Sequence, residues 1–184
     1  MNSKMNHSLS HYLHALSTAN WQTLEQFVFP SPTAKEWLTE QGSLSRRIKQ
    51  SCTSLSVELV SNHEHHMSQM TGEEIGMLSQ EDSWLREVVL LGDNTPWVLG
   101  RTLMPVSTMK VGQFDLSQQG TIPLGITVFS SANAKRDSLM VASVDINGST
   151  LLARRSRLWM SESPCLVAEL FLPESPVYAM EKDA

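Results

Sequence analysis

The chain has 184 residues, of which 41% are hydrophobic and 18% are charged, and its net charge at pH 7 is -5. This length and composition indicate a globular protein with a core of its own and exclude a disordered chain. The acidic balance, with a pI near 5.6, does not favour a nucleic acid or an anionic membrane surface as partner. No apolar run approaches the ~20 residues needed to span a bilayer, so no membrane insertion is expected.

The N-terminus is polar and lacks the apolar segment that signal peptides carry. The two cysteines, Cys52 and Cys165, lie in apolar stretches with the character of strands. We therefore expect buried free thiols in place of a disulfide. A reducing cytoplasm is the expected location, because disulfides persist in oxidising compartments.

The first 50 residues have the pattern of helices. Apolar residues recur mostly at helical spacing over residues 9–29, which predicts a first helical region that Ser17-Thr18 could interrupt. A second helix is predicted after an N-cap at Thr33, and a third after an N-cap at Ser43. Serine and threonine are suited to these positions because their side chains accept hydrogen bonds from the first turn of a helix.

The period of the apolar residues then changes to two. This alternation predicts a strand over residues 51–60, whereas the polar residues 61–82 are expected to form a long loop. Two further strands, at residues 83–91 and 96–104, flank the turn Gly92-Asp93-Asn94-Thr95. A short turn of this composition between two strands predicts a β-hairpin.

The rest of the chain completes the expected fold class. Residues 111–126 are rich in glycine and are expected to form a loop that holds a single helical turn. Residues 150–160 and 165–172 are predicted to form a second hairpin. Strands joined by short turns, with helices gathered near the N-terminus, predict an α+β fold with an antiparallel sheet. Residues 1–184 are expected to form one domain, with residues 179–184 as a loose tail.

Two charged residues, Arg86 and Glu169, lie on strand faces that are otherwise apolar. Their neighbours on these faces are Trp84, Val88 and Leu90 for Arg86, and Cys165, Val167 and Phe171 for Glu169. A buried charge is costly unless it is paired. One interpretation is a structural salt bridge between the two residues; the other is a pocket for a small anion that also carries a hydroxyl. The spacing alone leaves both open, since structural ion pairs resemble functional sites.

A histidine cluster, His63-Glu64-His65-His66, is the only stretch that suggests a metal site. It lacks the zincin spacing of two histidines four residues apart on a helix, and no third ligand is evident. A solvated cluster in a loop is the favoured interpretation. We found no phosphate-binding glycine loop and no nucleophile elbow in the sequence.

Further arginines lie on the predicted strands. Arg155 and Arg157 share one strand face with Trp159, while Arg154 points to the other face. They could form a solvent-facing stripe balanced by nearby acids, or they could attract an anionic ligand. Arg101 also lies on an apolar face, and an ion pair with an acid such as Glu87 is one explanation for it.

Five pieces of the sequence occur in the order, and at nearly the spacing, that is seen in the bacterial chorismate lyases. The chain resembles this family over about residues 37–178. The pieces are Trp84-Leu85-Arg86-Glu87; Gly100-Arg101-Thr102 with Pro105-Val106-Ser107; Pro123-Leu124-Gly125; Arg154-Arg155-Ser156-Arg157-Leu158; and Glu169-Leu170-Phe171-Leu172-Pro173 with Ser175-Pro176 and Tyr178.

The resemblance implies a fold and a reaction. The fold would be a single antiparallel sheet with helices packed on one side and flap loops that enclose the ligand. The reaction would split chorismate into 4-hydroxybenzoate and pyruvate, the first committed step toward ubiquinone, with no cofactor, no metal and a monomer as the working unit. The alternative is a non-catalytic sensor of a small ligand, because the effector domains of some transcription regulators have a similar fold.

The resemblance also implies site residues. The family's arginine for the ring carboxylate corresponds to Arg86, and its glutamate for the ring hydroxyl corresponds to Glu169. Two backbone contacts of the family fall on Leu44 and Leu124. Residues Ile122 and Ile126 replace a threonine and an arginine that are common beside the Pro-Leu-Gly loop, which leaves the outer contacts of the loop open.

Overall fold

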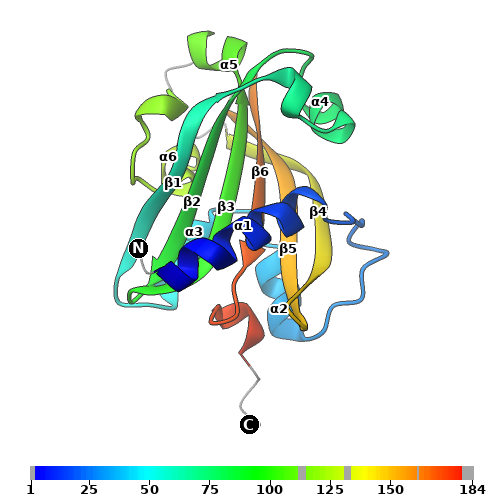
Figure 1. The fold of residues 1–184 in the computed structure, drawn as a ribbon, viewed down its shortest axis with the longest axis vertical. Coiled ribbons are helices and arrows are strands. Elements are labelled where there is room, and N and C mark those ends of the chain that lie inside the picture. Colours follow the sequence, from blue (N-terminus) through cyan, green and yellow to red (C-terminus); the bar gives the residue numbers. More distant parts are fainter. Residues whose placement is uncertain (1–2, 112–114, 131–133, 161, 180–184) are drawn as a thin grey trace.

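A computed structural model describes residues 3–111, 115–130, 134–160 and 162–179 (Figure 1). Six strands form a single antiparallel sheet in the order β1-β2-β3-β6-β5-β4. The strands are β1 (Leu55–His65), β2 (Ser83–Gly92), β3 (Thr95–Pro105), β4 (Ala134–Ile146), β5 (Ser149–Met160) and β6 (Ser163–Phe171). The α-helices are α1 (Ser3–Ser17), α2 (Pro32–Leu38), α3 (Leu44–Gln50), α4 (Gly72–Met77), α5 (Val106–Val111) and α6 (Leu124–Val128). Short 3₁₀ turns occur at Met67–Gln69, Leu116–Gln118 and Pro176–Tyr178.

The α+β class, the antiparallel sheet and both predicted hairpins are confirmed. The first hairpin turns at Asp93 and Asn94, whose φ angles of 49° and 64° give the left-handed turn that matches the twist of the strands. The Asp93 carboxylate also accepts hydrogen bonds from the backbone N–H groups of Thr53 and Ser54. This contact holds the start of β1 against the turn.

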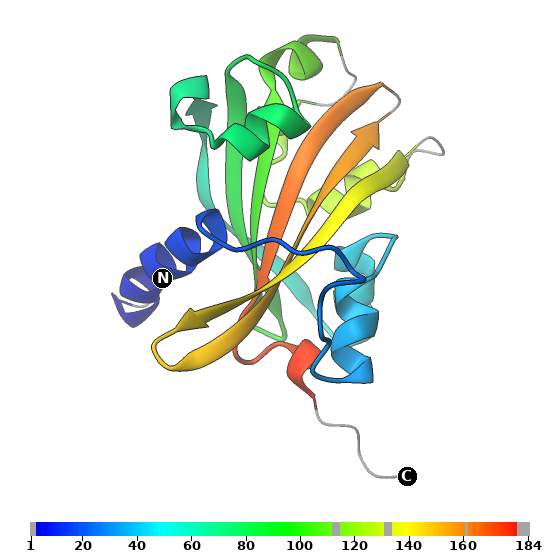
Figure 2. The same cartoon turned by 90° about the vertical axis from the view of Figure 1, so that its right-hand side faces the viewer.

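Helices cover both faces of the sheet, whereas the family resemblance implied one (Figures 1 and 2). On one face, here called the α3 face, helices α2 and α3 pack on residues such as Val88 and Leu90. On the opposite face, the α1 face, helix α1 packs on residues such as Val89 and Leu91. The run of consecutive apolar residues in β2 explains the difference, because a strand that is apolar on both faces needs cover on both.

The N-terminal region departs from its predicted pattern. Helix α1 ends at Ser17, where the hydroxyls of Ser17 and Thr18 both donate to the carbonyl of His14. The chain beyond it runs along the sheet edge, and Gln22 forms a two-way backbone bridge with Val141 of β4. The prediction of helix up to residue 29 is therefore wrong, because pairing with an edge strand competes with helix formation there.

The caps of the next two helices can be compared with their predictions. Ser31, and not Thr33, caps α2, because its hydroxyl accepts from the backbone N–H of Ala34 at 3.0 Å. The predicted cap of α3 is confirmed, and the Ser43 hydroxyl accepts from the N–H of Arg46.

Two segments of the middle and late chain were not anticipated. The predicted loop at 61–82 instead extends β1 to His65 and then forms a 3₁₀ turn and α4, which Thr71 and Glu74 cap reciprocally. Strand β4 has no counterpart among the predicted elements; it lies at the sheet edge, where many of its residues are exposed and its apolar alternation is weak. The predicted tail lies outside the described residues apart from Ala179.

Candidate active site

The two charged residues that were predicted on apolar strand faces, Arg86 and Glu169, both lie on the α3 face of the sheet. Strands β3, β6 and β5 lie side by side, and Gly100, Glu169 and Arg154 form one register row across them. Arg86 projects from β2 one row further along the same face. The small Gly100 therefore lies on the sheet between the arginine strand and the glutamate.

Arg86 is a buried cation without an acidic partner. Arg86 is only 1% exposed to solvent. Its Nη2 donates hydrogen bonds to the carbonyls of Gly120 and Ile122 at 2.9 and 3.1 Å. Its buried Nε has no hydrogen-bond partner, and no carboxylate of the described residues lies within 4.0 Å of the guanidinium. Burial lowers the pKa of Arg86 to about 10, so the group is still charged at neutral pH. This arrangement presents a positive charge to an incoming anion.

Glu169 is paired with a different arginine, so the interpretation as a salt bridge between Arg86 and Glu169 is wrong. The Arg154 Nε donates to Oε2 of Glu169 in a short, buried contact. Oε1 of Glu169 has no partner among the described side chains and backbone groups. One carboxylate oxygen is thus held by the protein, and the other is free to accept a hydrogen bond from a ligand.

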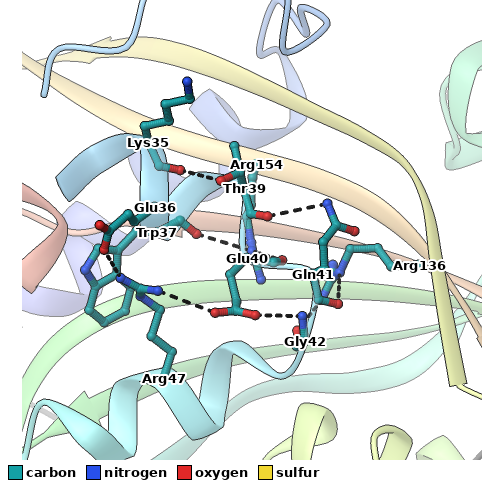
Figure 3. A network of polar contacts seen from close by, with 10 residues as sticks. All are labelled: Lys35, Glu36, Trp37, Thr39, Glu40, Gln41, Gly42, Arg47, Arg136 and Arg154. Carbon is teal, nitrogen blue, oxygen red and sulfur yellow. Dashed lines mark hydrogen bonds and ion pairs between the residues drawn. The ribbon is translucent and has the colours of Figure 1, made fainter. Parts of the chain in front are cut away.

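Arg154 also contacts the end of α2 and the segment that follows it (Figure 3). Its Nη1 donates to the carbonyls of Trp37 and Glu40 at 3.3 and 2.9 Å. Arg136 of β4 donates in parallel to the carbonyls of Gln41 and Gly42. The segment that leads into the first residue of α3 is therefore held by two arginines from the sheet, of which Arg154 is fully buried and Arg136 is half-buried.

The two arginines lie close enough to influence each other. Burial, and then the nearby positive charge of Arg154, lower the pKa of Arg136 to about 10. Glu40 adds a third tether, since its carboxylate accepts from the N–H of Gly42 at 2.7 Å and pairs with Arg47. The roles of Arg136 and Arg154 were not predicted, although Arg154 was correctly placed on the face opposite Arg155.

Leu44 and Leu124 occupy equivalent positions, each the first residue of a short helix. The N–H groups of a helix's first turn have no partner within the helix, and neither of these two donates a hydrogen bond to any described group. The helices α3 and α6 approach closely at Gly125, where a Cβ would lie 2.7 Å from the Ser43 hydroxyl oxygen. Glycine at this position lets the starts of the two helices come close together, and Leu44 and Leu124 line the same cavity.

That cavity is lined by all four predicted site residues: Leu44, Arg86, Leu124 and Glu169. Its volume is only about 40 Å³. A cavity that holds a benzene ring measures about 150 Å³, so the side chains and backbone that line this cavity must move apart to admit a ring compound.

The remaining arginines of the strands, Arg101, Arg155 and Arg157, lie on the α1 face and are ion-paired. Arg101 forms the predicted ion pair with Glu87 at 3.9 Å, and it also forms a closer ion pair with Glu74. Arg155 pairs with Glu73 at 2.9 Å. The expected stripe is thus balanced by acids, although Arg155 is buried and does not face solvent.

The histidines do not form a metal site in the described part of the chain. His63 and His65 end β1 with ring centroids 6.5 Å apart, and His65 is buried, in contrast to the solvated loop that was expected. Among the described residues, no group of three or more histidine, cysteine or acidic side chains is placed to hold an ion. Both cysteines are free thiols, and burial raises the pKa of Cys165 to about 12, which makes it a poor nucleophile.

The chain matches the family model described as chorismate lyase over residues 15–183. It belongs to the chorismate lyase family. A probable chorismate pyruvate-lyase of Vibrio parahaemolyticus is 54% identical over 97% of this chain and 99% of its own length. The corresponding protein of Vibrio cholerae is 49% identical over the same shares, and a chorismate pyruvate-lyase of Serratia proteamaculans is 42% identical over 82% of this chain and 84% of its own.

Solved structures resemble this lyase family member in fold alone. The effector domain of PhnF from Mycobacterium smegmatis has a TM-score of 0.51 at 14% identity and covers 72% of this chain and 90% of that one. A GntR-family regulator from Enterococcus faecalis has a TM-score of 0.50 at 14% identity, over 69% of this chain and 100% of that one. Within the described residues, no helix is long and apolar enough to cross a membrane.

Proposed function

We propose that this protein is an enzyme that cleaves chorismate to 4-hydroxybenzoate and pyruvate in the cavity on the α3 face. The observation that carries the proposal is that Arg86, Glu169 and the first residues of two helices, Leu44 and Leu124, line one cavity. Relatives at 42–54% identity bear the name chorismate pyruvate-lyase, which supports the same reaction.

In this proposal the ring carboxylate of chorismate binds Arg86, whose buried charge has no acidic partner in the described protein. A planar guanidinium suits a carboxylate because two parallel hydrogen bonds can form. The N–H groups of Leu44 and Leu124 supply further donors to the anionic groups of the substrate. Only the main chain acts at these two positions, so the identity of the side chain matters little.

Glu169 is assigned to the ring hydroxyl at the other end of the substrate. Its free oxygen accepts a hydrogen bond from the ring hydroxyl, while Arg154 holds the second oxygen in place. The reaction breaks the bond between the ring carbon and the ether oxygen and removes the hydrogen of the neighbouring, hydroxyl-bearing carbon. The released enolpyruvate takes up a proton to become pyruvate, and the ring becomes aromatic.

Positioning and exclusion of water account for the catalysis in this proposal. Aromatisation drives the elimination, so a site that holds the ring flat and dry lowers much of the barrier. The departure at Ile122 does not disturb this picture, because Arg86 contacts the main-chain carbonyl of Ile122 while the Ile122 side chain is 56% exposed. By resemblance to the family we further propose a cytoplasmic monomer whose product feeds ubiquinone synthesis.

The test is turnover by the purified chain. We expect chorismate to yield 4-hydroxybenzoate, followed by its absorbance, and pyruvate, followed by a coupled dehydrogenase, in equal amounts. A control without protein measures spontaneous breakdown. Saturable binding of chorismate without either product would contradict the proposal and favour a sensor of a small ligand.

A further inference from the structure

A second and larger cavity lies on the α1 face of the sheet. Its volume is about 400 Å³, and it is bounded by the end of α1, the start of α4 and strands β3, β5 and β6. Figure 2 shows α1 and α4 on the same side of the sheet, away from α2 and α3. None of the four residues assigned to chorismate contributes to its lining. The larger hollow is therefore separate from the proposed active site.

The floor of this cavity is a small residue between two arginines. Ala168 of β6 pairs in register with Arg101 of β3 on one side and with Arg155 of β5 on the other. Each strand spacing is about 4.8 Å, so the two arginines flank a gap of roughly 10 Å between their backbones. A methyl group in the centre of the row leaves the space above it open.

Arg155 is buried in this wall with part of its hydrogen-bonding capacity unused. The residue is 5% exposed, and its Nε has no partner. Its guanidinium lies over the indole ring of Trp21 at 4.8 Å from the ring centroid, and Trp21 also lines the cavity. A buried cation against an aromatic face, with an unused donor, is suited to a ligand that has both a carboxylate and a flat apolar body.

The two arginines differ in how firmly their acidic partners are held. Arg101 and Glu74 are both buried, with side chains 12% and 8% exposed, so that pair is structural. Arg155 instead pairs with Glu73, whose side chain is 68% exposed. Because the Glu73 carboxylate lies largely in water, little free energy holds it on Arg155, and another carboxylate can replace it.

We propose that the cavity on the α1 face binds a small organic carboxylate, which replaces Glu73 on Arg155 and rests its apolar body against Trp21, Leu16 and Leu166. The site is distinct from the chorismate site because Arg154 and Arg155, like Ala168 and Glu169, are consecutive residues that point to opposite faces of the sheet. Glu73 acts as a built-in competitor at the mouth of the cavity.

The probe is benzoate, and calorimetric titration follows its binding to the Arg86→Ala variant, in which the proposed chorismate site has lost its cation. We expect saturable binding of one benzoate per chain to persist in Arg86→Ala. Adding Arg155→Gln should weaken it at least about tenfold, the size of a charge-assisted hydrogen bond. Adding Glu73→Gln should strengthen it, because the competing carboxylate is removed. Benzyl alcohol, which lacks the charge, should not bind.

A matched control keeps the outcome clear. Arg157→Gln removes an arginine on the same face of β5 that pairs with Asp137 and does not line the cavity, so it should leave benzoate binding unchanged. Loss of all benzoate binding in Arg86→Ala alone would overturn the proposal of a second site. It would not contradict the assignment of Arg86 to the chorismate site. Glu73 is exposed, so Glu73→Gln tests the idea even if Arg155→Gln does not fold; an unchanged or weaker affinity in Glu73→Gln would also overturn it.

Discussion

Arg86 offers a way to separate ligand binding from folding stability. Replacement by alanine removes the cation assigned to the ring carboxylate, and truncating one member of a buried charged pair costs about 2–5 kcal/mol of binding free energy. At 1.36 kcal/mol per factor of ten, we expect affinity for 4-hydroxybenzoate to fall roughly 30-fold to 5,000-fold in Arg86→Ala. Arg86→Lys should restore only part of the loss, because a lysine cannot form the two parallel hydrogen bonds.

The effect of the same substitution on folding should be small. Arg86 donates hydrogen bonds to the carbonyls of Gly120 and Ile122, which together contribute about 1–3 kcal/mol. Their loss is offset because the variant no longer buries an unpaired charge, and no carboxylate of the described chain is orphaned. The assay combines calorimetric titration of 4-hydroxybenzoate with urea unfolding. Unchanged affinity in a folded variant would refute the assignment, and collapse of the fold would refute the claim that the charge is unpaired.

Four further predictions concern the proposed active site and the histidine cluster. Arg154→Met should lower the free energy of unfolding by about 3–5 kcal/mol in urea melts, because Glu169 is left as a buried unpaired charge; equal stability would show that the pair is not structural. Glu169→Gln should keep the fold and most of the product affinity but change kcat, and an unaltered kcat would reduce the residue to a neutral hydrogen-bond partner. Turnover should survive EDTA and the replacement of His63, His65 and His66; a loss that one divalent ion restores would contradict the expectation, drawn from the family resemblance, of a reaction without metal. Rapid mixing should show a burst of product before a slower steady rate, because the lining of the small cavity must move apart to release the product, whereas a linear first turnover would place the slow step earlier.

The sequence predicted which charged residues are buried at the candidate site, but it did not predict their ion-pair partners. Arg86 and Glu169 were recognisable because a charge on an apolar strand face needs a reason, and both are indeed buried on the same face. Their pairing was not recognisable, because it depends on the order of strands in the sheet. Strand β6 lies between β3 and β5, which brings Arg154 beside Glu169 and leaves Arg86 two strands away.

The misses in the fold have similar causes. The pattern over residues 9–29 was apolar at helical spacing, but only contact with Val141 at the sheet edge decides that Gln22 is extended. His65 is polar in sequence and buried in the structure, because α4 and Arg101 lie near it. Each of these features depends on a residue far away in the sequence, which local propensity cannot report.

The strands β3, β5 and β6 supply neighbouring residues to two cavities, and this restricts how the chain can change in length. Gly100 and Glu169 serve one face, and the residues next to them, Arg101 and Ala168, serve the other. One residue inserted into or deleted from such a strand would move every later side chain to the opposite face of the sheet. The side chains that line one cavity would then be replaced by those that line the other. Length variation among relatives should therefore gather in turns such as that at Asn147 and Gly148, where positive φ angles of 53° and 81° already mark a reversal of the chain.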